Sequence, residues 1–233
     1  MRAMLEERSD LVDEIRWTPR LRQFADQSID HQLEINDAII ALIRGTDRTG
    51  AAKVLNWFDD DLLSKRTRFK GFIPDGFCLV QVVTGSEDDP DVRIFPLFLE
   101  IDRGTETIKS GGKGGRDWYS KIRRYGNYFA IEYPRDPFYL TLGFTPEEVN
   151  LFEAPRVLTI TTNPNRVEKM IATTHKAQGS SAYWYASRED VHDTPNAIMG
   201  EVWRNPMLAY PHKKRLDVHL LGLPEIGPDY SLF

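Results

Sequence analysis

Apolar and polar residues follow two periods along this chain, and the changes between them predict an order of helices and strands. Where apolar residues recur every three to four positions the pattern predicts a helix, as over 30–44, with Gly45 expected to end it. Short β-branched and aromatic runs between turn residues predict strands. Helices are predicted over 30–44, 116–132 and 163–177, and strands over 52–57, 75–83, 93–102, 155–162 and 181–187.

This order, α-β-β-β-α-β-α-β, predicts an α/β (α+β mixed) fold with a mixed sheet of four to five strands flanked by helices. Pro96 inside the third strand predicts a sheet edge or a bulge there. The same order is found in the restriction-endonuclease-like core of the PD-(D/E)xK nucleases, although unrelated functions can share a fold order. We expect three segments: an N-terminal helical extension (1–29), a nuclease-like core (30–188) and an irregular C-terminal segment (189–233), packed on the core or used in assembly.

Composition and charge narrow the class of protein. The chain has 233 residues, of which 41% are hydrophobic and 28% are charged, as in an ordinary globular protein. A single cysteine excludes a disulfide framework and favours a reducing compartment. No apolar run approaches the ~20 residues that span a bilayer, so we expect a cytoplasmic protein with no membrane partner. The net charge of −5 argues against a sequence-independent coat on nucleic acid.

Three carboxylates stand at the ends of two predicted strands. Asp75 begins the second strand, and Glu100 and Asp102 end the third. Alternate strand positions project to one face about 6.6–7 Å apart, and hairpin pairing would bring Asp75 opposite them. Such a cluster favours Mg²⁺ or Mn²⁺, which prefer oxygen ligands and can activate water for phosphodiester cleavage. The alternative is structural: Asp75 and 102–105 form turns, and Glu100 pairs with Arg103 or Arg123.

The PD-(D/E)xK pattern has an acid, then acid-x-lysine on the next strand. This chain has Pro74-Asp75 and then Glu100-Ile101-Asp102, with aspartate in the place of lysine. We therefore expect Lys121, on the following helix, to supply the cation. Glu34 or Asp37 in the first helix would supply the additional acid that such nucleases often carry.

Basic residues around these acids predict contacts with DNA phosphates, with ordinary solvated surface as the alternative. The candidates are Lys65, Arg66, Arg68, Lys70, Arg103, Lys113 and Arg116.

Several segments occur in an order that is similar to one known family. They are HQLEIND (31–37), Trp57, PDGF (74–77), FLEIDRGTE (98–106), KIRRY (121–125), PRVLTITT (155–162) and EVWRNP (201–206). The series resembles the replication-relaxation family of bacterial plasmids and integrative elements, over about 30–206. Members commonly carry a winged-helix domain ahead of the HxLxIND helix, and the stretch before it here is too short for one. The resemblance therefore implies DNA binding by the core itself or targeting by a partner.

Three functions are compatible with these observations. The resemblance implies a role in plasmid replication, mobilisation or DNA relaxation, with DNA and replication or mobilisation proteins as partners. The carboxylates predict a metal-dependent endonuclease or nickase, whereas the missing lysine predicts a non-catalytic DNA-binding or relaxosome accessory protein. An adaptor that binds a protein partner through its acidic face is the third.

Overall fold

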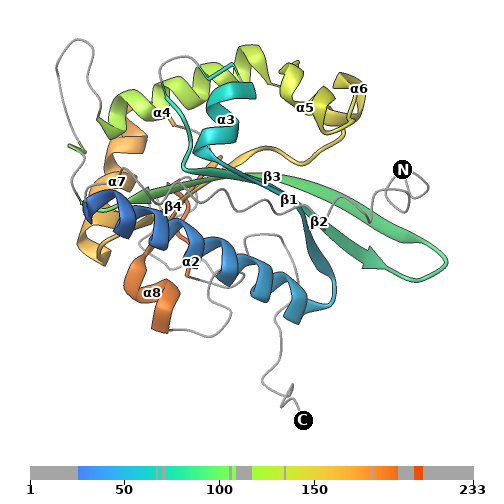
Figure 1. Cartoon of the computed structure of the whole chain (residues 1–233), viewed down its shortest axis with the longest axis horizontal. Helices are drawn as coiled ribbons and strands as arrows, with labels where there is room; N and C mark the ends of the chain where they lie inside the picture. Colours follow the sequence, from blue (N-terminus) through green and yellow to red (C-terminus); the bar gives the residue numbers. More distant parts are fainter. Residues whose placement is uncertain are drawn as a thin grey trace.

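A computed structural model describes residues 26–66, 68–69, 72–104, 107–108, 117–133, 135–179, 181–193 and 202–206. Its centre is a five-stranded sheet with helices on both faces (Figure 1). The strands are β1 (Ala52–Asp59), β2 (Gly76–Gly85), β3 (Pro90–Asp102), β4 (Arg156–Thr161) and β5 (Tyr183–Ser187). The helices are α2 (Asp26–Thr49), α3 (Asp60–Arg66), α4 (Trp118–Asn127), the π-helical turn η2 (Tyr128–Glu132), α5 (Pro137–Thr141), α6 (Pro146–Val149), α7 (Pro164–Lys176) and α8 (Arg188–Asp193).

The strands lie in the sheet in their sequence order, β1-β2-β3-β4-β5. The pairs β1–β2 and β2–β3 are antiparallel, whereas β3–β4 and β4–β5 are parallel. Strand β2 therefore runs opposite to the other four. The predicted mixed sheet flanked by helices is confirmed.

Alternation along β3 assigns its side chains to two cores. Leu97, Leu99 and Ile101 join the cluster that α2 covers. Phe98 joins the cluster on the other face, which is covered by α3, α4 and α7 (Figure 1). Since Glu100 has the same parity as Phe98, the strand period directs it toward α4.

The predicted elements differ from the observed ones mainly at their ends. Gly45 does not end the first helix, which continues to Thr49. Gly50 follows with φ +63°, the left-handed conformation that commonly terminates helices. Pro96 pairs with Leu79 just before β3 first meets β4, at Leu97, so this part of β3 is an edge on one side as predicted.

Two parts of the described chain extend the predicted organisation. The helices α3, α5, α6 and α8 were not predicted; α5 begins where Asp136 accepts from the Phe138 backbone N–H, and Thr145 forms a capping box at α6. Residues 202–206 lie against the sheet, where Trp203 is buried and Arg204 bridges to Tyr185.

None of the helices in the described part of the chain is long and apolar enough to cross a membrane.

Candidate functional site

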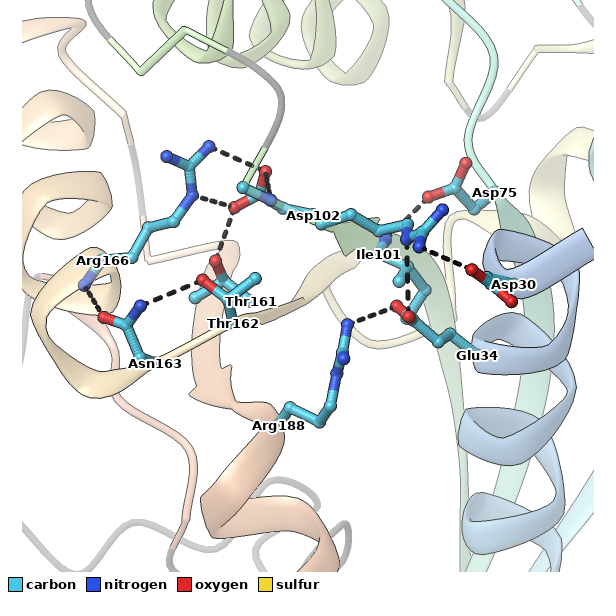
Figure 2. A network of polar contacts seen from close by, with 12 residues as sticks. Asp30, Glu34, Asp75, Ile101, Asp102, Thr161, Thr162, Asn163, Arg166 and Arg188 are labelled. Carbon is cyan, nitrogen blue, oxygen red and sulfur yellow. Dashed lines mark hydrogen bonds and ion pairs between the residues drawn. The ribbon is translucent and has the colours of Figure 1, made fainter. Parts of the chain in front are cut away.

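The β2–β3 hairpin places Asp75 beside the end of β3. Gly76 is paired with Leu99 in the antiparallel hairpin. Asp75, one residue earlier, therefore lies beside the last residues of β3. Its Oδ2 accepts a hydrogen bond from the Ile101 backbone N–H at 2.6 Å (Figure 2). Its Oδ1 lies 3.1 Å from Nε2 of His31 on α2. Asp75 thus links the sheet end to α2.

Glu100 is held by two side chains of α4. The residue is 2% exposed, and its Oε2 lies 2.7 Å from Lys121 Nζ. Its Oε1 accepts from the Tyr125 hydroxyl at 2.6 Å. Lys121 and Tyr125 are one helical turn apart and therefore share a face of α4. Asp117 caps that helix, accepting from the Ser120 backbone N–H, so the cap and the strand end together position the pair.

The electrostatics of Glu100 reflect its burial. The pKa of Glu100 is raised to about 7: desolvation by burial is the largest cause, the charge of Lys121 opposes it, and the nearby charge of Asp75 adds to it. Burial also raises the pKa of Tyr125 well above its ordinary value, so its hydroxyl stays protonated and donates. Asp75 and Glu100 are therefore electrostatically coupled, with Lys121 as the neighbouring cation.

Asp102 faces a different partner. It is 4% exposed, and both its oxygens bind Arg166, with Oδ2 2.5 Å from Nε and Oδ1 2.8 Å from Nη2 (Figure 2). The Thr161 hydroxyl also donates to Oδ2, and the Gly104 backbone N–H donates to Oδ1. Arg166 lies in the first turn of α7, which Asn163 caps. The bond from the Gly104 N–H agrees with the start of the turn over 102–105 in the structural alternative, and residue 105 lies outside the described residues.

The three predicted metal ligands are not gathered around one point. Within the described residues, no group of three or more His, Cys, Asp or Glu side chains could hold a metal ion. The structure couples Asp75 with Glu100 and turns Asp102 toward α7. Lys121, predicted as the cation, contacts Glu100 directly.

The predicted additional acids lie on α2. Glu34 forms ion pairs with Arg103, at 3.4 Å, and with Arg188, at 2.6 Å (Figure 2). Arg103 also contacts Asp30, whereas the cation beside Glu100 is Lys121 rather than the Arg103 or Arg123 of the structural alternative. Asp37 is exposed.

The predicted phosphate-binding residues are only partly described. Lys65 is paired with Asp61 on α3, and Arg68 lies 3.6 Å from Glu132. Arg103 belongs to the acidic network on α2. The positions of Lys70, Lys113 and Arg116, and the side chain of Arg66, lie outside the described residues.

Two contacts at the site were not predicted from the sequence. His31 is the first residue of the HxLxIND segment, and its helix packs beside Asp75. Arg166 follows the helix start Asn163-Pro164 by two residues. Because β3 and β4 are parallel, the helix that follows β4 begins near the end of β3, and this topology was the available signal for Arg166.

Fold and site together define an α/β protein with a buried acid–lysine pair at the end of a hairpin. The family model of replication-relaxation proteins matches residues 3–139, more than half of the 233 residues, and the chain belongs to this family. The match begins earlier and ends earlier than the expected 30–206. No curated protein and no solved structure matches the chain. Family membership connects the protein with replication-related DNA processing.

Proposed function

We propose that this protein is a metal-dependent DNA endonuclease or nickase that acts in the replication or mobilisation of a plasmid or integrative element. The contact between Lys121 Nζ and the buried Glu100, 2.7 Å apart beside Asp75, carries the proposal. Asp75 and Glu100 stand where the PD-(D/E)xK pattern has its two acids. Lys121 supplies the cation of that pattern from α4 instead of from β3. The strand order, with only β2 reversed, supports a restriction-endonuclease-like core.

Asp75 and Glu100 fit a Mg²⁺ or Mn²⁺ ion better than Asp102 does. Mg²⁺ commonly uses one or two carboxylates and completes its shell with water and substrate phosphate. The hydroxyl of Thr159, opposite Glu100 on β4, is buried without a hydrogen-bond partner among the described residues and would suit such a water. Asp102 does not fit, because Arg166 occupies both of its oxygens. When bound, the ion would polarise the scissile phosphodiester and activate a water.

The chain's own groups provide positioning and charge. The Ile101 N–H and His31 fix the orientation of Asp75. Tyr125 donates to Glu100 and leaves its other oxygen to Lys121. The side chain of Lys121 is 19% exposed, so its ammonium group stands at the boundary between the buried acid and solvent. From there it would stabilise the negative charge that develops on the phosphoryl oxygens.

A second candidate is a non-catalytic DNA-binding or relaxosome accessory protein. It is favoured by the internal donors that each carboxylate already has, above all the Arg166 pair of Asp102. In that case the polar contacts would only hold the sheet end to α2, α4 and α7.

Nicking of a supercoiled plasmid with Mg²⁺ or Mn²⁺, against an EDTA control, tests the first function. We expect wild type to nick, and Asp75→Asn and Lys121→Met each to lower the rate about 100-fold or more, because a charge at the reacting phosphate is lost. The matched control is Lys53→Met, which removes an exposed lysine from β1. Circular dichroism verifies that each variant is folded.

The outcomes separate the two candidates. If wild type binds the plasmid but never nicks it, or if both site variants nick as fast as Lys53→Met, the nuclease proposal is wrong. Retained DNA binding would then support the accessory function.

A further inference from the structure

A pocket lies next to the candidate site, between the end of β3 and the first two turns of α7. Its volume is about 260 Å³. Among the described residues, its polar lining consists of Thr162, Asn163, Asn165, Arg166 and Lys169, and Gly104, two residues after β3, and Ile108 complete it. These described lining residues provide two cations, two amides and a hydroxyl, and no carboxylate. Such groups are hydrogen-bond donors for an anion.

Arg166 is fixed in the wall of this pocket by a buried acid. Asp102 binds Nε and Nη2 of the guanidinium and is itself held by Thr161 (Figure 2). This bidentate pair fixes the orientation of the guanidinium plane. Where the nuclease pattern has a lysine on β3, Asp102 brings a guanidinium from α7 to the same strand end. Arg166 is thus a second cation at this end of the sheet, besides Lys121 on α4.

Lys169 adds a second cation one turn further along α7. It is exposed, and it forms no ion pair within the described part of the chain. Asn165, also exposed, has no side-chain hydrogen bond to the described residues. Lysine, arginine and asparagine side chains are among those that contact phosphate oxygens in protein–DNA complexes.

We infer that this pocket binds one backbone phosphate of the DNA strand that lies across the Glu100 site. The inference rests on the proposed function, since it supplies the substrate contact of the same site. The pocket is below the ~300–1,000 Å³ of sites for drug-sized ligands, which suits a phosphodiester group better than a whole base. A free phosphate ion or a nucleotide presents the same chemistry, so the experiment must separate these sources.

The test measures DNA affinity in EDTA, where no cleavage is needed. Binding of a short fluorescent duplex and of its single strand is followed over a salt series for wild type, Lys169→Ala and Asn165→Ala. The matched control is Lys176→Ala, an exposed lysine at the far end of the same helix. We expect Lys169→Ala to lose about five- to tenfold in affinity at low salt and to reduce the slope of log K against log salt by about one. Asn165→Ala should weaken binding with little change in slope, and Lys176→Ala should match wild type.

The second arm uses inorganic phosphate. The side-chain amide signal of Asn165 is followed by NMR during titration with phosphate, and phosphate should displace the DNA from wild type more effectively than from Lys169→Ala. If Lys169→Ala keeps the slope and affinity of Lys176→Ala, the inference is overturned. If phosphate shifts the Asn165 signal while DNA binding ignores Lys169, the pocket takes free phosphate and the DNA assignment is wrong.

These results are independent of catalysis. If Lys169→Ala weakens DNA binding but wild type does not nick, the phosphate subsite is supported and the nuclease proposal is wrong. If wild type nicks but Lys169→Ala binds DNA as wild type does, the nuclease proposal is supported and the subsite is wrong.

Discussion

Replacing Glu100 by glutamine should remove a pH dependence of stability that burial builds into the fold. Burial raises the pKa of Glu100 from its ordinary 4.5 to about 7, despite the opposing effect of Lys121. The pKa is higher in the folded protein than in the unfolded chain, so between these values the unfolded chain binds fewer protons. Stability therefore falls as pH rises: the contribution is complete below about pH 4.5 and is lost as pH passes about 7.

The magnitude follows from the difference between the two pKa values. One pKa unit corresponds to about 1.4 kcal/mol, so the raised pKa of Glu100 is worth about 3 kcal/mol across this interval. Glu100→Gln keeps the side-chain shape and an acceptor for Tyr125 but cannot ionise. Relative to this variant, wild type should lose about 3 kcal/mol of unfolding free energy between about pH 4.5 and about pH 8. Protonation of His31 contributes to both proteins and cancels in the difference.

Urea unfolding followed by tryptophan fluorescence, in EDTA and at a series of pH values, measures this difference. Glu87→Gln, which changes an exposed carboxylate in the β2–β3 turn, is the control and should follow wild type. If the difference between wild type and Glu100→Gln varies by less than about 0.5 kcal/mol over the series, the pKa of Glu100 is the same in the folded and the unfolded chain. Its burial would then impose no cost, and the argument from desolvation would be refuted.

Two further predictions concern packing and ion pairing. Arg166→Met should destabilise the protein by about 3–5 kcal/mol in urea unfolding, because it removes the guanidinium from the buried Asp102 and leaves its charge to the neutral donors of Thr161 and Gly104. The double variant Asp102→Asn/Arg166→Met should recover at least half of this loss, and a single-variant loss below about 1 kcal/mol would contradict the assignment. Gly76→Ala should lower the free energy of unfolding by about 1–3 kcal/mol, since the added Cβ would lie 2.0 Å from the Trp57 ring. Gly126→Ala, where the added Cβ meets open space on α4, should not destabilise the protein. Equal thermal midpoints for the two variants would contradict this packing of Gly76 against Trp57.

The sheet could be predicted because its patterns are strong and local. The strands β2 and β3 are apolar runs bounded by turn residues, and their hairpin register brings Asp75 to the end of β3. Lys121 was within reach of prediction because the helix that follows β3 returns over the strand end. The four short helices could not be predicted, because each is too short to show an apolar helical period. Capping residues such as Asp136 mark where they begin.

The partner of Asp102 depends on the tertiary arrangement. Arg166 is 64 residues away along the chain, and the two meet only because β4 joins β3 in parallel. The same limit applies to Glu34, whose pairing with Arg188 spans 154 residues. Local pattern predicted which acids stand at the strand ends, whereas the parallel half of the sheet decided which cations reach them.

The order of strands in the sheet also bears on how the protein folds. Strands β2 and β3 pair through a short turn, which closes fast, whereas β1 joins β2 across a segment that contains α3, and β4 and β5 follow crossovers that contain helices. If the β2–β3 hairpin forms before β4 joins it, the segment Leu97–Asp102 is an unpaired edge of the sheet during that time. An apolar edge of this kind can pair with another chain and start aggregation. Glu100 and Asp102 would then place charges on this edge before Lys121 and Arg166 pack beside them, and charges on an exposed edge oppose pairing with another chain. The acids proposed to serve the finished site would therefore also limit aggregation until α4 and α7 pack on the sheet.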